Sequence, residues 1–108
     1  MITTTSNDVA NHTITQYLGV VRGIVVRSPT IAQGVMGGLK TIIGGNNESF
    51  AKVCEAARQD AFDKMVAHAE ELGAHAIIGM RYDATDLGPS ITEVLAYGTA
   101  VSLVRHAD

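Results

Sequence analysis

The sequence predicts an α+β fold with the element order β-α-α-β-β, and three patterns in the chain predict it. A run rich in β-branched residues comes first, a long apolar stripe at helical spacing follows, and two further apolar runs come last. Two successive strands after a helix most simply form an antiparallel hairpin. No internal repeat or linker divides the 108 residues, so we expect a single domain over residues 1–108.

The first predicted strand covers residues 14–27, after a polar segment, residues 1–12, that we interpret as an arm or an edge strand. Gly19 and Gly23 are candidate positions for a bend. Apolar side chains occupy both faces of this strand. One face holds Leu18, Val20, Ile24 and Val26, and the other holds Val21 and Val25. A strand that is apolar on both faces is covered on both faces, and in so short a chain the second cover is expected from another subunit.

Two helices are predicted next. A short one over residues 31–43 contains three glycines, Gly34, Gly37 and Gly38. We interpret these three and Gly79 as positions where backbones pack closely. A long one over residues 48–72 stops at Gly73. Its apolar stripe consists of Phe50, Cys54, Ala57, Ala61, Met65, His68 and Leu72. This helix would be about 37 Å long, so we expect it to extend beyond its sheet and contact a neighbour.

Two strands complete the fold, over residues 76–83 and 91–104, with a turn over residues 86–90 between them. The aromatic share of the chain is only 5%, although 46% of residues are hydrophobic. A core built mainly from aliphatic side chains and alanine is thin for a lone monomer of this length. The composition therefore favours burial against other copies of the chain.

Charge is concentrated on the long helix. Residues 48–72 hold six acids and three bases, and the remaining residues hold five of each, so the net charge of −3 resides on this element. Glu48–Lys52 and Asp60–Lys64 are acid-before-base pairs at helical spacing. Lysines and arginines are scattered singly elsewhere, which argues against a nucleic-acid partner.

The expected location is the cytoplasm. No apolar run approaches the roughly 20 residues of a membrane span, and the first residues lack the pattern of a signal peptide, so no membrane partner is expected. A single cysteine, Cys54, forms no internal disulfide and fits a reducing compartment.

Metal binding is the chemistry that the side chains most nearly support. Cys54 and His68 lie on the same helix face, but 14 residues separate them, about 21 Å along the axis. One subunit cannot bring both to one ion, whereas two subunits could, and a soft divalent ion would be the ligand. The simpler interpretation is that Cys54 is a small core residue and His68 a half-buried histidine with one hydrogen bond.

The remaining motifs give weaker indications of a function. Residues 34–41 nearly match the phosphate-binding pattern G-x-x-x-x-G-K-[ST], but Leu39 replaces its second glycine. Asp83, Thr85 and Asp86 are oxygen-rich without the order of a calcium loop, so a hairpin loop is the simpler interpretation. No catalytic motif is found, and the sequence identifies no catalytic residue.

Several segments together resemble the YbjQ-like family, small bacterial and archaeal proteins often labelled as heavy-metal-binding. They are residues 17–23 (YLGVVRG), 38–45 (GLKTIIGG), 72–82 (LGAHAIIGMRY) and 97–101 (YGTAV). The resemblance covers about residues 14–104. It implies a dodecin-like subunit with a helix on a curved antiparallel sheet, assembled into a ring, specifically a homopentamer. Its matching residues are mainly glycine, alanine and aliphatic, so it implies a fold more than a ligand set.

We therefore expect a non-enzymatic, ring-forming protein that binds a small ligand or soft metal at subunit junctions. One alternative is a small-molecule enzyme with an inter-subunit site involving Arg22, Arg81, Tyr82 or Asp83. Another is an interaction module that presents its acidic helices to a basic partner. The sequence identifies neither the ligand nor the partner.

Overall fold

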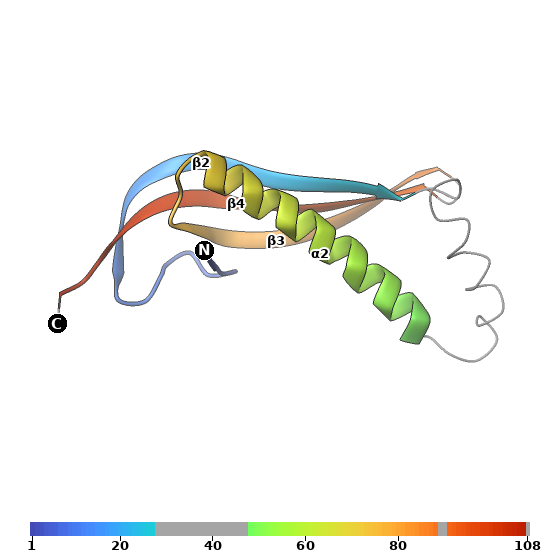
Figure 1. The fold of residues 1–108 in the computed structure, drawn as a ribbon, viewed down its shortest axis with the longest axis horizontal. Helices are drawn as coiled ribbons and strands as arrows, with labels where there is room; N and C mark the ends of the chain where they lie inside the picture. The colour runs from blue at the N-terminus through green and yellow to red at the C-terminus, as the bar shows by residue number, and fades with distance from the viewer. Residues whose placement is uncertain (28–47, 89–90, 108) are drawn as a thin grey trace.

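A computed structural model describes residues 1–27, 48–88 and 91–107 of the chain, and the side chains of residues 48–50 lie outside that description. Within these ranges one helix lies against one face of a sheet with strand order β1-β3-β4-β2 (Figure 1). The elements are β1 (Ile2–Thr3), β2 (His12–Arg27), α2 (Glu48–Glu71), β3 (Ala76–Gly88) and β4 (Ile91–Arg105). The predicted α+β class is confirmed. The helix expected over residues 31–43 lies outside the described residues, together with Gly34, Gly37, Gly38 and the 34–41 motif.

The sheet is mixed, which corrects the expectation of a purely antiparallel one. β4 pairs antiparallel with both β2 and β3, whereas β1 pairs parallel with the beginning of β3. The N-terminal segment is thus both an edge strand and an arm, because Gly79 and Met80 donate their backbone N–H groups to the carbonyls of Ser6 and Thr4 at 2.8 and 3.0 Å. The expected turn over 86–90 is also shortened, since β3 continues to Gly88.

Register shifts explain two differences from the expected strand pattern. One shift lies between Tyr17 and Gly19. It places Leu18 against the core beneath α2, whereas Val20, expected on the same face as Leu18, lies on the opposite face. A second lies between Ile78 and Arg81, where Gly79 has a φ of +60°. Gly79 therefore serves the backbone conformation of a bulge and not the close packing expected for it.

The main core lies between α2 and the sheet. The helix contributes three alanines and a methionine spaced four residues apart, and the strands contribute valine, isoleucine, methionine and alanine. The helix residues with 4% exposure or less are Ala57, Ala61, Met65 and Ala69. A second cluster on the opposite face, beneath Val9 of the arm and the start of β2, contains Ala76, Ile78, Val101 and Leu103.

The small helix side chains allow α2 to approach β2 closely at Gly23. A Cβ added to Gly23 would overlap the carbonyl oxygen of Ala61 and would lie 2.6 Å from the backbone nitrogen of Met65. Gly23 is therefore a contact point between the helix and strand backbones, which corrects its interpretation as a bend.

Only the later part of α2 packs on the sheet. In Figure 1 its green first turns lie away from the strands, and its yellow end lies against them. Residues 51–56 are exposed apart from the half-buried Val53, so Cys54 is exposed although the predicted stripe placed it in the core. Leu72 is exposed too, because the helix ends at Glu71 and the N–H groups of Gly73 and Ala74 cap the carbonyls of Glu70 and Ala69.

One aromatic contact joins the middle of α2 to β3. The guanidinium carbon of Arg58 lies 5.6 Å from the centre of the Tyr82 ring, a cation–π distance. Burial raises the pKa of the Tyr82 phenol, Arg58 opposes this effect, and Glu55 and Asp63 reinforce it. Tyr82 thus remains a neutral phenol at physiological pH.

Among the described residues, no helix combines the length and the apolar character needed to cross a lipid bilayer.

We predict that Gly23→Ala destabilises the protein by about 1–3 kcal/mol, because the new methyl group has no room against the Ala61 carbonyl. Chemical denaturation followed by circular dichroism measures the loss. Gln16→Ala, at an exposed position of the same strand, is the control and should stay within about 0.5 kcal/mol of the parent. Equal stability of the Gly23 and Gln16 variants would contradict the contact.

The raised pKa of Tyr82 leads us to predict that the folded protein loses stability at high pH. Because the pKa of Tyr82 is raised in the folded state, the unfolded chain releases this proton first, and stability falls as pH rises above 10.0. Tyr82→Phe removes this contribution, so its stability should decline less steeply than that of the parent. Arg58→Gln removes the charge that lowers the pKa and should steepen the decline. Parallel curves of denaturation midpoint against pH for all three proteins would refute the assignment.

Candidate functional site

The face of the sheet opposite α2 carries apolar side chains that the described residues leave exposed. Cross-strand pairing places Val20, Ile24 and Val26 of β2 beside Thr99, Leu95 and Glu93 of β4, on the face that points away from the helix. We call Val20, Ile24, Val26, Leu95 and Tyr97 the uncovered face. The exposed fractions are 69% for Val20, 40% for Ile24, 44% for Val26 and 37% for Tyr97, and Leu95 is half-buried.

Two arginines flank Tyr97 across this face. Register pairs Tyr97 with Arg22 of β2 on one side and with Arg81 of β3 on the other. Arg81 Nη1 donates to the carbonyl of Thr5 at 3.0 Å and to its neighbouring Met80 carbonyl at 2.8 Å, so this side chain holds the N-terminal arm. Arg22 remains exposed beside the apolar side chains.

The four residues expected for an inter-subunit catalytic site are divided between the two faces. Arg22, Arg81 and Asp83 belong to the uncovered side of the sheet, since Asp83 pairs with Leu95. Tyr82 points to the other side, where Arg58 of the helix covers its ring. The structure therefore does not bring these four side chains together within one chain.

The outer edge of β2 is closed in its middle by two side chains of α2. The N–H of Arg22 donates to Nδ1 of His68 at 3.3 Å, and Nζ of Lys64 donates to the carbonyl of Ile24 at 3.3 Å. Alternate residues of an edge strand direct their polar backbone groups outward, where they can pair with another strand. Lys64 and His68, one helical turn apart, satisfy two of these groups.

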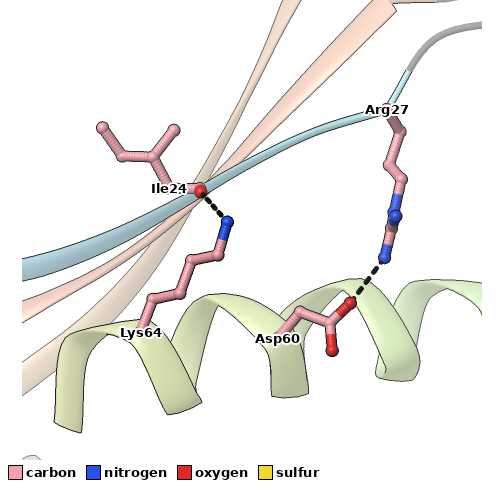
Figure 2. Close-up of polar contacts among 4 residues, drawn as sticks. All are labelled: Ile24, Arg27, Asp60 and Lys64. Carbon is pink, nitrogen blue, oxygen red and sulfur yellow. Dashed lines mark hydrogen bonds and ion pairs between the residues drawn. The ribbon is translucent and has the colours of Figure 1, made fainter. Parts of the chain in front are cut away.

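An ion pair continues this contact toward the end of β2. Arg27 Nη2 lies 2.8 Å from Asp60 Oδ2, and Figure 2 shows this pair beside the Lys64–Ile24 hydrogen bond. The sequence pairs Asp60 with Lys64 along the helix, but each of them instead reaches a different residue of β2. A groove of about 390 Å³ lies here, lined by Val25, Val26, Arg27, Asp60, Asp63 and Lys64. With both side chains of the pair at least a third exposed, the pair contributes little to stability.

The predicted metal ligands do not meet within one chain. Cys54 is exposed on the first part of α2 that projects from the sheet, and His68 is half-buried beside β2. The described residues contain no cluster of three or more histidine, cysteine or acidic side chains able to hold a metal ion. A shared site for Cys54 and His68 therefore stays a prediction that requires different subunits.

The bond to Arg22 also constrains His68. Nδ1 accepts a hydrogen bond from the Arg22 backbone N–H, so the neutral ring carries its own proton on Nε2. A metal at Nε2 would require the proton to move to Nδ1, which would break the bond to the Arg22 N–H. The expectation of one hydrogen bond to a half-buried histidine is confirmed. Sequence reasoning missed its edge-capping role, and the only available signal was the four-residue spacing of Lys64 and His68.

Comparisons with known proteins agree with this architecture. The crystal structure of a protein of unknown function from Pediococcus pentosaceus, assigned to the DUF74 family, superposes with a TM-score of 0.55 at 23% identity and covers 96% of this chain and 98% of its own. This likeness concerns the fold alone. A UPF0145 protein from Legionella pneumophila strain Corby is 56% identical over 101 residues, which are 94% of this chain and 96% of the relative. Another from Burkholderia ambifaria is 54% identical over 104 residues, 96% of this chain and 85% of the relative.

A family model also matches residues 1–104, and its description reads "Putative heavy-metal-binding". The match spans nearly the whole chain, including the arm, α2 and the three long strands. This protein therefore belongs to the YbjQ family, whose UPF0145 members it resembles along their length.

Proposed function

We propose that this protein is the subunit of a homo-oligomeric ring that binds a small ligand or a soft metal ion at its subunit junctions. The observation that carries the proposal is the uncovered face. Exposed β-branched side chains gathered on one face of a sheet are the usual sign of a surface that another protein element covers.

A second copy of the chain is the occupant that its own exposed surfaces favour. α2 carries the excess of acidic residues, and its first turns present small side chains, Ala51, Cys54 and Ala56, that are not covered by the sheet. The uncovered face offers exposed apolar side chains, and Arg22 lies exposed beside them. The first turns of one helix on the uncovered face of the next subunit would bury both surfaces.

Such a contact joins two different surfaces of the chain. Contacts of this type repeat from copy to copy and form a closed ring when the rotation between copies fits. Five subunits is the number implied by the family resemblance, and we include it in the proposal. The exposed thiol of Cys54 fits the reducing conditions of the cytoplasm, which is the location we propose.

The junctions would then carry the binding sites. In this arrangement Cys54 of one subunit would face residues of its neighbour, and symmetry would repeat this single soft ligand around the ring. We favour binding over catalysis because the polar groups considered for catalysis are divided between the two faces of the sheet.

Val20→Asp tests the assembly. A carboxylate at this position would be buried without a partner at the proposed contact, so each contact should weaken about a hundredfold or more, and the mass from light scattering should fall toward the 11.4 kDa of one chain. Val104→Asp is the matched control, because Val104 is 57% exposed and lies outside the uncovered face. A parent protein that is already monomeric would refute the ring.

Cadmium titration by calorimetry tests the metal version of the site. We expect the assembled parent protein to bind Cd²⁺ and Cys54→Ser to lose that binding, because a thiolate is its softest donor. His68→Asn keeps an acceptor for the Arg22 N–H but lacks Nε2, so it should weaken binding only if His68 is a second ligand. Absence of Cd²⁺ binding in the assembled parent would eliminate the metal version.

A further inference from the structure

A second pocket lies at the end of the sheet remote from the first turns of α2. It has a volume of about 200 Å³ and is lined by Ile2, His12, His75, Leu103 and Arg105. These residues come from β1, the beginning of β2, the loop before β3 and the end of β4. None of these five lining residues is acidic, and His12, His75 and Arg105 have basic side chains. The chain as a whole has a net charge of −3. The pocket is thus a basic site on an acidic protein.

Backbone contacts determine which nitrogen of each histidine carries the proton. His12 Nδ1 lies 2.7 Å from the carbonyl of Ala10, which can only accept, so Nδ1 is protonated and Nε2 of the neutral ring has a lone pair. His75 is the reverse case. Its Nδ1 accepts the N–H of Leu103 at 2.9 Å, so its Nε2 carries the proton.

The two rings therefore offer opposite hydrogen-bonding groups. Neither Nε2 atom has a hydrogen-bond partner among the residues that the structure describes. His75 Nε2–H is a donor, His12 Nε2 is an acceptor, and Arg105 supplies a permanent positive charge with several donors. His12 and Arg105 are also direct cross-strand partners, which holds them at one place in the sheet.

We propose that this pocket binds a phosphate ion that retains one proton. Arg105 and His75 would donate to its charged oxygens, and its O–H would donate to His12 Nε2. Hydrogen phosphate offers both kinds of group at neutral pH, whereas sulfate has no proton to give. A metal ion fits less well, because His75 Nε2 has no lone pair while Nδ1 accepts from Leu103.

The test is a calorimetric titration of the full chain with inorganic phosphate and, separately, with sulfate at neutral pH. We expect phosphate to bind more tightly than sulfate. His12→Asn keeps a donor toward the Ala10 carbonyl but removes Nε2, so it should weaken phosphate binding about tenfold and abolish the preference over sulfate. Arg105→Gln should weaken the binding of both ions.

Two further variants assign the binding to this pocket and to a single chain. His106→Gln alters a histidine that does not line the pocket and should bind phosphate like the parent protein. Val20→Asp should also bind phosphate normally, because all five lining residues belong to one chain, so the proposal does not depend on the ring. Absence of phosphate binding, equal binding of sulfate, or an unchanged His12→Asn variant would overturn it.

Discussion

The backbones of α2 and β2 meet at Gly23, and this contact sets how closely the helix lies on the sheet. The Ala61 carbonyl lies where a side chain of residue 23 would begin, and small helix residues make this approach possible. Since the helix lies so close to the strand, Lys64 and His68 reach the outer edge of β2 and satisfy its backbone groups. Packing and protection of the edge are therefore consequences of one steric arrangement.

The same arrangement leaves the opposite face of the sheet available. α2 covers one side of β2, and the N-terminal arm, held by Arg81, covers the region around Ile78 and Val101 on the other side of the sheet. The apolar residues around Val20 and Ile24 are left exposed. Among the residues that the structure describes, β2 thus has two apolar faces and a covering helix on one of them, which is the physical basis for the proposed ring.

The candidate ligands illustrate how context changes the chemistry of a side chain. Periodicity predicts that Cys54 is a core residue. It is exposed because the first turns of α2, which contain it, do not lie on the sheet. His68 has its Nδ1 occupied by the Arg22 N–H, which opposes metal binding through Nε2. His12 and His75 lie far apart along the chain, although the fold brings both to one pocket. Their opposite proton positions come from neighbouring backbone groups, which sequence does not reveal.

Local sequence is enough to predict the long strands, the helix from Glu48 and the α+β class, because these depend on local periodicity, β-branched runs and the stop at Gly73. It also indicated that β2 is apolar on two faces. The parallel pairing of β1, the register shifts between the strands, and the partners of Asp60, Lys64 and His68 emerge only in the folded chain. Those features depend on contacts between residues far apart in the chain, and local spacing holds no information about which distant groups will meet.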